Sequence, residues 1–212
     1  MIHIILAADE KLKFFFEKNY ESVSKFYSNI LVYDLGNLGI GKKLELSTSY
    51  TANQKFPKKP LVLLDALENV KEGDNLIWLD CDTLIVDRID EVFNTEFNIG
   101  VTIRKRKSKK IQESWINSGV IFLKNNYETT QFVKDWLTAS EQMNGDQFSI
   151  NSLIKLKTPN PNDKIKVKNV NVQLFPCWIY NNFYFNDDQS EAKILHYKTD
   201  VRKFYPFKYQ DV

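Results

Sequence analysis

The stretch LIWLDCDTLIVD, residues 76–87, decides the fold. Residues 76–80 are predicted as a buried strand that ends at Asp80, and Asp82 follows after one intervening residue. Side chains at positions i and i+2 of an extended segment point the same way, so both carboxylates can face one ion. The alternative is a pair of turn residues at a strand end, whose carboxylates would then need other partners.

Strands and helices alternate on both sides of this segment. The apolar run 2–8 is followed by Asp9, a suitable helix N-cap residue, and then by apolar side chains at helical spacing. This alternation predicts an α/β fold with a largely parallel sheet and helices on both faces. In open α/β sheets, ligands bind beyond the carboxyl ends of the strands, which is where Asp80 and Asp82 fall. The other predicted strands are 29–34, 98–103, 118–123, short strands within 165–172, and 194–197, and the predicted helices are 10–27, 61–70 and the segments around Phe132–Leu137 and Phe148–Ile154.

The composition favours a single domain over residues 1–212. Hydrophobic residues make up 43% of the chain, which suffices for one compact core. The formal charge of +2 argues against a nucleic-acid partner. No apolar stretch approaches the ~20 residues of a transmembrane segment, and the N-terminus lacks the pattern of a signal peptide. With only Cys81 and Cys177 and no glycosylation sequon, a reducing, cytoplasmic compartment is expected.

Five segments, taken in order, carry a family resemblance: residues 5–9 (ILAAD), 80–82 (DCD), 116–124 (INSGVIFLK), 144–151 (NGDQFSIN) and 194–198 (ILHYK). Together they resemble the GT-A fold glycosyltransferases, most of all the glycogenin-like and galactosyltransferase-like retaining branch, over nearly the whole chain. The resemblance implies a Rossmann-like GT-A sheet, mixed and mostly parallel. It also implies transfer of a hexose or deoxyhexose from a UDP-sugar to a saccharide acceptor, with retention. Further domains of a longer polypeptide are an alternative source of the acceptor site.

The resemblance implies a metal site formed by Asp80, Asp82 and His196. A nucleotide-sugar donor leaves as a diphosphate, and a divalent cation that bridges both phosphates neutralises the growing charge. Carboxylate ligands suit Mg²⁺ or Mn²⁺, whereas an imidazole ligand favours Mn²⁺. Without the resemblance, His196 reads as a core side chain on a strand.

The resemblance also assigns donor contacts and catalytic residues. Asp146 would hydrogen-bond the sugar hydroxyls, and Gln147 would stabilise the developing oxocarbenium ion, although Gly145–Gln147 also reads as an ordinary helix N-terminus. The diphosphate would meet Lys198, with Arg202 and Lys203 as alternatives, because Thr199 and Arg202 depart from the family pattern His-x-x-Gly-x-x-Lys. The implied donor contacts are Leu6, Ala7, Ala8 and Asp9 for uracil and ribose, the Cys81 backbone for ribose, and Lys59 or Lys58, Asn117, Ser118 and Gly119 for the sugar.

Two further segments and two rival functions remain open. The aromatic segment 178–185 is either core packing or a sugar-binding wall, and the basic loop 104–110 is either a solvated loop or a lid over the site. A haloacid-dehalogenase-type phosphatase also has an Asp-x-Asp after a buried strand, but that family has Thr or Val where this chain has Leu84. The second rival hypothesis is a non-catalytic carbohydrate-binding domain.

Overall fold

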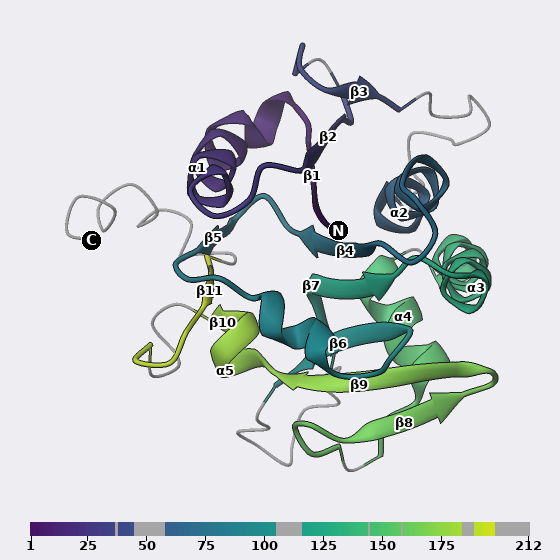
Figure 1. Cartoon of the computed structure of the whole chain (residues 1–212). Helices are drawn as coiled ribbons and strands as arrows, with labels where there is room; N and C mark the ends of the chain where they lie inside the picture. The colour runs from purple at the N-terminus through teal and green to yellow at the C-terminus, as the bar shows by residue number, and fades with distance from the viewer. Residues whose placement is uncertain are drawn as a thin grey trace.

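A computed structural model describes residues 1–36, 38–44, 58–104, 116–143, 145–157, 159–183 and 189–197. Eight strands within these ranges form one sheet in the order β3-β2-β1-β4-β7-β6-β9-β8, which runs through the molecule with helices on both sides (Figure 1). Four of its seven strand pairings are parallel, and the pairings β4–β7, β6–β7 and β8–β9 are antiparallel. The predicted mixed, mostly parallel sheet is therefore confirmed. The strands are β1 (Ile2–Ala8), β2 (Ile30–Asp34), β3 (Lys42–Lys43), β4 (Asn75–Leu79), β6 (Ile99–Ile103), β7 (Ile116–Lys124), β8 (Lys164–Val167) and β9 (Val170–Pro176).

Alternate side chains of the central strands build a core on each face of the sheet. In β1, Ile5 and Ala7 join the cluster that includes residues of α2, α3 and α4, whereas Ile4, Leu6 and Ala8 join the cluster on the side of α1. Figure 1 shows α1 on one side of the sheet and α2 and α3 on the other. No helix in the described ranges has the length and apolar composition to cross a membrane. The helices are η1 (Glu10–Leu12), α1 (Lys13–Ser24), α2 (Lys58–Asn69), η2 (Asp90–Asn94), α3 (Tyr127–Met143), α4 (Asp146–Ile154) and α5 (Cys177–Tyr180).

The helix predicted over 10–27 is shorter than expected. The chain first makes the 3-10 turn η1, where Asp9 stands at the N-cap position without a side-chain capping hydrogen bond. The backbone N–H groups of Phe26 and Tyr27 both donate to the carbonyl of Val23, which tightens the last turn and ends the helix. The helix boundaries predicted from spacing alone were therefore too wide at both ends.

The turn after β2 is organised by the last residue of that strand. The Asp34 carboxylate accepts the backbone N–H groups of Gly36, Leu38 and Gly39. These bonds, led by the one from Gly36, lower the pKa of the Asp34 carboxyl. The turn follows the carboxyl end of β2, next to the carboxyl end of β1, because the two strands are parallel neighbours.

A second sheet of three strands, in the order β10-β11-β5, stands at the end of β4. Its strands are β5 (Thr83–Ile85), β10 (Asn182–Phe183) and β11 (Ile194–His196). The strand predicted over 194–197 is present, whereas β5 was not predicted, because it is three residues long and follows a turn. In the antiparallel pairing of β5 with β11, His196 lies opposite Thr83. This pairing brings His196 beside Asp82.

Candidate metal and donor-binding site

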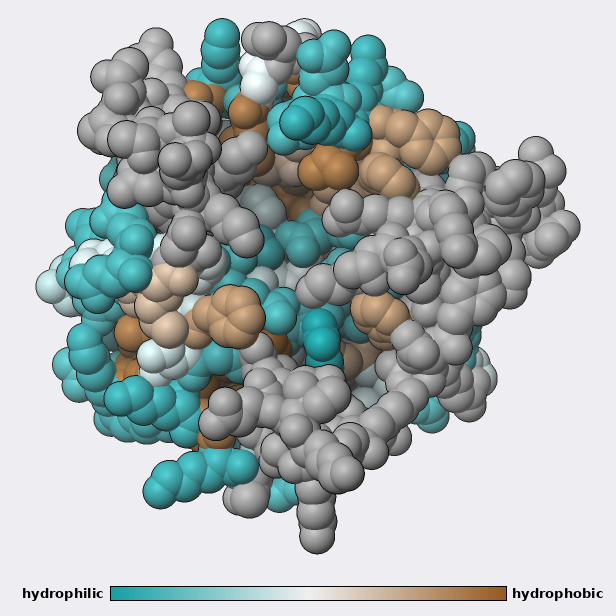
Figure 2. Space-filling view, turned by 180° about the vertical axis from the view of Figure 1, so that it is seen from behind, coloured by the Kyte–Doolittle hydropathy of each residue, from teal (hydrophilic) through white to brown (hydrophobic). Residues whose placement is uncertain are grey.

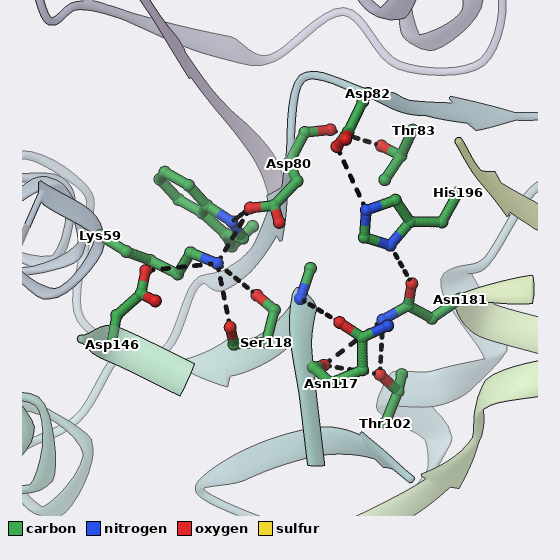
Figure 3. Close-up of polar contacts among 12 residues, drawn as sticks. Lys59, Asp80, Asp82, Thr83, Thr102, Asn117, Ser118, Asp146, Asn181 and His196 are labelled. Carbon is green, nitrogen blue, oxygen red and sulfur yellow. Dashed lines mark hydrogen bonds and ion pairs between the residues drawn. The ribbon is translucent and has the colours of Figure 1, made fainter. Parts of the chain in front are cut away.

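Asp80, Asp82 and His196 form a group that could hold a divalent cation. One ligand atom from each lies within 4.8 Å of those of the other two. Figure 3 shows the three side chains converging, with Asp80 and Asp82 on the turn between β4 and β5 and His196 on β11. Asp82 and His196 are buried, and the Asp80 side chain is 27% exposed. The three residues predicted as metal ligands therefore meet at the carboxyl end of β4.

The imidazole of His196 fits a cation at this point. Its Nε2 is buried without a hydrogen-bond partner and lies 3.2 Å from Asp82 Oδ1. A buried ring nitrogen without such a partner is costly unless something else satisfies it. A cation bound between Asp82 and Nε2 would do so, and carboxylate oxygens with one imidazole nitrogen are ligands suited to Mn²⁺ or Mg²⁺.

The strand β7 is irregular at the point where it meets this group. Its pairing with β6 shifts register between Val101 and Thr102, which leaves the β7 residues Ser118–Val120 without register partners on β6. The backbone N–H of Asp80 donates to the carbonyl of Gly119 at 2.8 Å. A Cβ built on Gly119 would lie 2.3 Å from His196 Cε1 and 2.7 Å from Nδ1. Glycine is therefore required here by the close approach of the imidazole.

Lys59 of α2 supplies a buried positive charge next to Asp80. Its ammonium lies 2.9 Å from Asp80 Oδ1 and 3.7 Å from Asp146 Oδ2, and it donates to the carbonyl of Ser118 at 2.6 Å. Burial alone would lower the pKa of Lys59, but the nearby charges of Asp80, Asp146 and Asp82 outweigh it and raise the pKa above its usual range. Lys59 is therefore a permanent cation in this site.

Trp78 fixes the orientation of the Asp80 carboxylate. Its indole N–H donates to Asp80 Oδ1 at 2.8 Å, the same oxygen that Lys59 contacts. The other oxygen, Oδ2, lies on the side of Gly119, because a Cβ on that glycine would approach it to 3.3 Å. One oxygen of Asp80 is thus held by the protein, while the other faces the group of metal-ligand candidates.

A cavity of about 450 Å³ opens beside this group. Seen from behind, the molecule has a hollow with a hydrophilic floor and apolar residues along one border (Figure 2). Leu12 and Leu35 were not predicted as cavity residues. Leu35 could have been found, because it follows the carboxyl end of β2, which lies next to the carboxyl end of β1. The lining residues are Ala7, Leu12, Leu35, Lys59, Trp78, Asp80, Cys81, Asp82, Ser118, Asp146 and Gln147.

Asp146 and Gln147 begin α4 on the wall of this cavity. The helix is held to α3, because Trp136 Nε1 donates to the carbonyl of Asp146 at 2.8 Å and to Ser149 Oγ at 3.0 Å. Asn151 joins the helix to β7 through paired hydrogen bonds with the backbone of Ile116. The two residues predicted to act near the donor sugar therefore stand on a firmly docked helix end.

The remaining predicted donor contacts lie outside the cavity lining or outside the described residues. Leu6 and Ala8 point into the core on the side of α1. Asn117 is buried, and its Oδ1 accepts the backbone N–H of Gly119 at 3.1 Å. Asp9 precedes η1 and does not line the cavity. Lys198, Arg202, Lys203, residues 105–110 of the basic loop and residues 184–185 of the aromatic segment lie outside the described residues.

Of the aromatic segment, Tyr180 belongs to the core. Its ring packs edge-on against Phe122 and Phe175, and its hydroxyl donates to Glu91 Oε1 at 3.0 Å. At this residue, core packing rather than a sugar-binding wall accounts for the aromatic side chain. Trp178 is half-buried.

Comparison with known proteins gives a family match over nearly the whole chain. A family model of nucleotide-diphospho-sugar transferases matches residues 3–203. No curated protein sequence matches the chain.

Among solved structures, a glycosyltransferase involved in the glycosylation of the major capsid of PBCV-1 is similar at 11% identity and a TM-score of 0.62, over 96% of both chains. GlyE of Streptococcus pneumoniae TIGR4 is similar at 16% identity and a TM-score of 0.60, over 96% of this chain and 58% of the other. An active-site mutant of LgtC is similar at 12% identity and a TM-score of 0.53, over 96% of this chain and 93% of the other. At these identities the likeness shows a shared fold. Because the family model covers nearly the whole chain, the protein belongs to the nucleotide-diphospho-sugar transferase family.

Proposed function

We propose that this protein transfers a hexose or deoxyhexose from a UDP-sugar to a saccharide acceptor with the help of Mn²⁺ or Mg²⁺. The observation that carries the proposal is the convergence of Asp80, Asp82 and His196 within 4.8 Å at the edge of a cavity that Lys59, Asp146 and Gln147 also line. A cation held there would neutralise the diphosphate as it leaves. The family membership supports a nucleotide-sugar donor, and UDP is our more specific assignment.

The cavity lining suggests how the donor lies. Ala7, Leu12 and Leu35 give one part of the wall an apolar character suited to the flat face of a nucleobase. The carboxylates of Asp80 and Asp82 mark the diphosphate end, because they would hold the cation that neutralises the leaving diphosphate. Ala7 on β1 has a short side chain, which lets a base approach the backbone of the strand end.

The sugar would lie against Lys59, Ser118 and the start of α4. Asp146 is turned towards the cavity with Lys59 3.7 Å away, and we assign it hydrogen bonds to the sugar hydroxyls. Gln147 follows on the same helix end, where its amide oxygen would stabilise positive charge on the anomeric carbon. Both residues are held by a docked helix, and such positioning can account for much of a transferase's rate.

Retention rests on the resemblance to the retaining branch. The acceptor hydroxyl would attack from the face that the diphosphate leaves, and the departing phosphate oxygen would take its proton. In that reaction the new glycosidic bond forms as the bond to the diphosphate breaks, and no protein base is required. The acceptor is proposed to be a saccharide that enters from the open side of the cavity.

The test is turnover of a panel of UDP-sugars with Mn²⁺, followed by UDP release and by NMR of the anomeric configuration of the product. We expect one donor to be hydrolysed or transferred with retention. Asp146→Asn should lower turnover, whereas Asp135→Asn, on α3 and outside the cavity lining, should not. An inverted product would refute the retaining assignment, and release of phosphate from sugar phosphates without any UDP-sugar turnover would favour the phosphatase reading.

A further inference from the structure

We infer that Asn181 is a positioning residue that keeps the proton of His196 on Nδ1, so that the lone pair of Nε2 faces the cation. This inference deepens the proposed function, since it rests on the proposed metal site. Asn181 follows α5 and is 1% exposed. Its Oδ1 lies 2.7 Å from His196 Nδ1 (Figure 3).

The orientation of the Asn181 amide follows from its other neighbours. Its Nδ2 lies 2.8 Å from Thr102 Oγ1 and 3.3 Å from the carbonyl oxygen of Asn117. The single hydroxyl hydrogen of Thr102 is donated to that same carbonyl at 2.9 Å, so the hydroxyl can only accept from Asn181. Both groups that face this end of the amide are therefore acceptors, and the end must be the NH₂ group. A flipped amide would place two carbonyl oxygens against each other.

The orientation of the amide determines the tautomer of the neutral imidazole. Because Asn181 presents its carbonyl oxygen to Nδ1, that nitrogen must carry the hydrogen and donate it. A neutral imidazole carries one hydrogen, so Nε2 is left with a lone pair, in keeping with its lack of a hydrogen-bond partner. A lone pair is what a cation requires of an imidazole ligand.

Asp82 competes for the same hydrogen. Its Oδ1 lies 3.2 Å from Nε2, so its negative charge favours a hydrogen on that nitrogen. An N–H at Nε2 would then occupy the position of the cation. Asn181 opposes this outcome, and the backbone N–H of Asn181, bound to the carbonyl of Cys177 at 2.8 Å, holds the residue at the end of α5.

The tautomer can be read directly, because the chain has only two histidines. Long-range ¹H–¹⁵N correlation spectra of the metal-free protein distinguish the two tautomers of a neutral imidazole. We expect His196 to show hydrogen on Nδ1 and a bare Nε2. His3 lies near the amino end of β1, where its Nε2 contacts Asp74, and it serves as the internal control. Hydrogen on Nε2 of His196 in the wild-type protein would overturn the inference.

Two substitutions of Asn181 test its role. In Asn181→Leu, similar in size but without an acceptor, we expect the hydrogen to move to Nε2 and the affinity for Mn²⁺ to fall by about 10- to 100-fold, as outer-shell substitutions typically do. Asn181→Asp keeps an acceptor for Nδ1 and should retain the wild-type tautomer. Mn²⁺ affinity is measured by electron paramagnetic resonance without donor. An unchanged tautomer or unchanged affinity in Asn181→Leu would contradict the inference.

A second pair of variants guards against misfolding of Asn181→Leu. Thr102→Val removes one of the two acceptors that orient the amide and leaves the Asn117 carbonyl, whereas Thr102→Ser preserves both. We expect Thr102→Val to mix the two tautomers and to weaken Mn²⁺ binding, while Thr102→Ser behaves as wild type. Equal spectra for the two variants would contradict the inference. Because these spectra are recorded without metal or donor, they remain decisive even if the protein proves to transfer no sugar.

Discussion

The two halves of the proposed metal site differ in what they contain before any cation binds. Around Asp80, the protein supplies both a hydrogen bond from Trp78 and the charge of Lys59. Around His196, the buried Nε2 faces Asp82 without a hydrogen-bond partner. In the first half, the fold itself supplies partners to Asp80 Oδ1, whereas in the second half a bound cation would be the partner of His196 Nε2. We therefore expect substitutions in the second half to cause the larger losses of Mn²⁺ affinity, and the loss of Lys59 in the first half to lower stability.

The largest expected effect is that of Asp82→Asn on metal-dependent binding. The substitution removes one of the three proposed metal ligands. We therefore expect Mn²⁺ binding to weaken by more than about a hundredfold, which exceeds the usual effect of an outer-shell residue. The increase in melting temperature that Mn²⁺ causes should disappear with it, because a ligand stabilises only the state it binds.

Calorimetry and thermal unfolding with and without Mn²⁺ measure both effects. Asp87 is an exposed carboxylate that follows β5, whereas Asp82 precedes this strand. Asp87→Asn is therefore the matched control and should retain wild-type Mn²⁺ binding. Undiminished Mn²⁺ binding in Asp82→Asn would show that Asp82 has been wrongly assigned as a metal ligand.

The next effect is that of Gly119→Ala. The added Cβ would lie 2.3 Å from His196 Cε1, so the imidazole must move away from the cation. We expect Mn²⁺ affinity to fall by roughly 10- to 100-fold, like the loss of an outer-shell partner. Gly145→Ala, whose Cβ would meet only Phe148 at 3.7 Å, provides the comparison. Equal Mn²⁺ affinities for the two variants would mean that the close approach to His196 has no consequence.

In the other half, Lys59→Met should lower the free energy of unfolding. Asp80 and Asp146 would lose their shared cation, and we expect a loss of roughly 1–3 kcal/mol, less than for a fully buried pair because both carboxylates keep contact with water. Since the folded-state pKa of Lys59 is raised, its contribution is fully present below the unfolded lysine pKa of about 10.4 and is lost as the pH rises through the folded-state pKa.

Denaturant unfolding from neutral to alkaline pH tests this sign. The stability difference between wild type and Lys59→Met should stay constant near neutral pH and shrink only above about pH 10.4. A difference that grew with rising pH would contradict the assignment of Lys59 as a cation in the folded state.

The smallest expected effect is that of Trp78→Phe. The ring keeps its packing, but Asp80 Oδ1 loses the indole N–H at 2.8 Å while the contact with Lys59 remains. One net hydrogen bond is worth about 0.5–1.5 kcal/mol, so Mn²⁺ affinity should fall by about two- to tenfold. Titration followed by electron paramagnetic resonance can resolve this change. A loss as large as that of Asp82→Asn would mean that Trp78 does more than orient one oxygen.

The two halves of the site also differ in how well the sequence predicted them. Asp80 and Asp82 could be placed beyond the carboxyl end of a buried strand. The alternation of side chains along a strand did not apply, because residues 80–83 form a turn in which the Thr83 N–H donates to the Asp80 carbonyl. His196 was assigned by resemblance, since its approach depends on the pairing of β5 with β11, and a three-residue strand leaves almost no periodic pattern. The antiparallel direction of β7 was equally hidden, because a buried strand is apolar in either orientation.

The residues that position His196 could not be predicted from sequence patterns. Asn181 and Thr102 are single polar residues whose spacing to His196 carries no recognisable motif. They meet only because β6, α5 and β11 converge behind the imidazole. Asn117 was expected beside the sugar from the resemblance alone, and its side chain is buried with its Oδ1 accepting the backbone N–H of Gly119.

The most direct test of the metal-dependent donor site is a calorimetric titration of UDP in the presence of Mn²⁺, repeated with a chelator and with Asp82→Asn. We predict binding with Mn²⁺ and its loss in both controls, because the diphosphate would be held through the cation at Asp80, Asp82 and His196. Binding of UDP that is equally tight without a metal and in Asp82→Asn would contradict the account, as would the absence of any UDP binding with Mn²⁺ present.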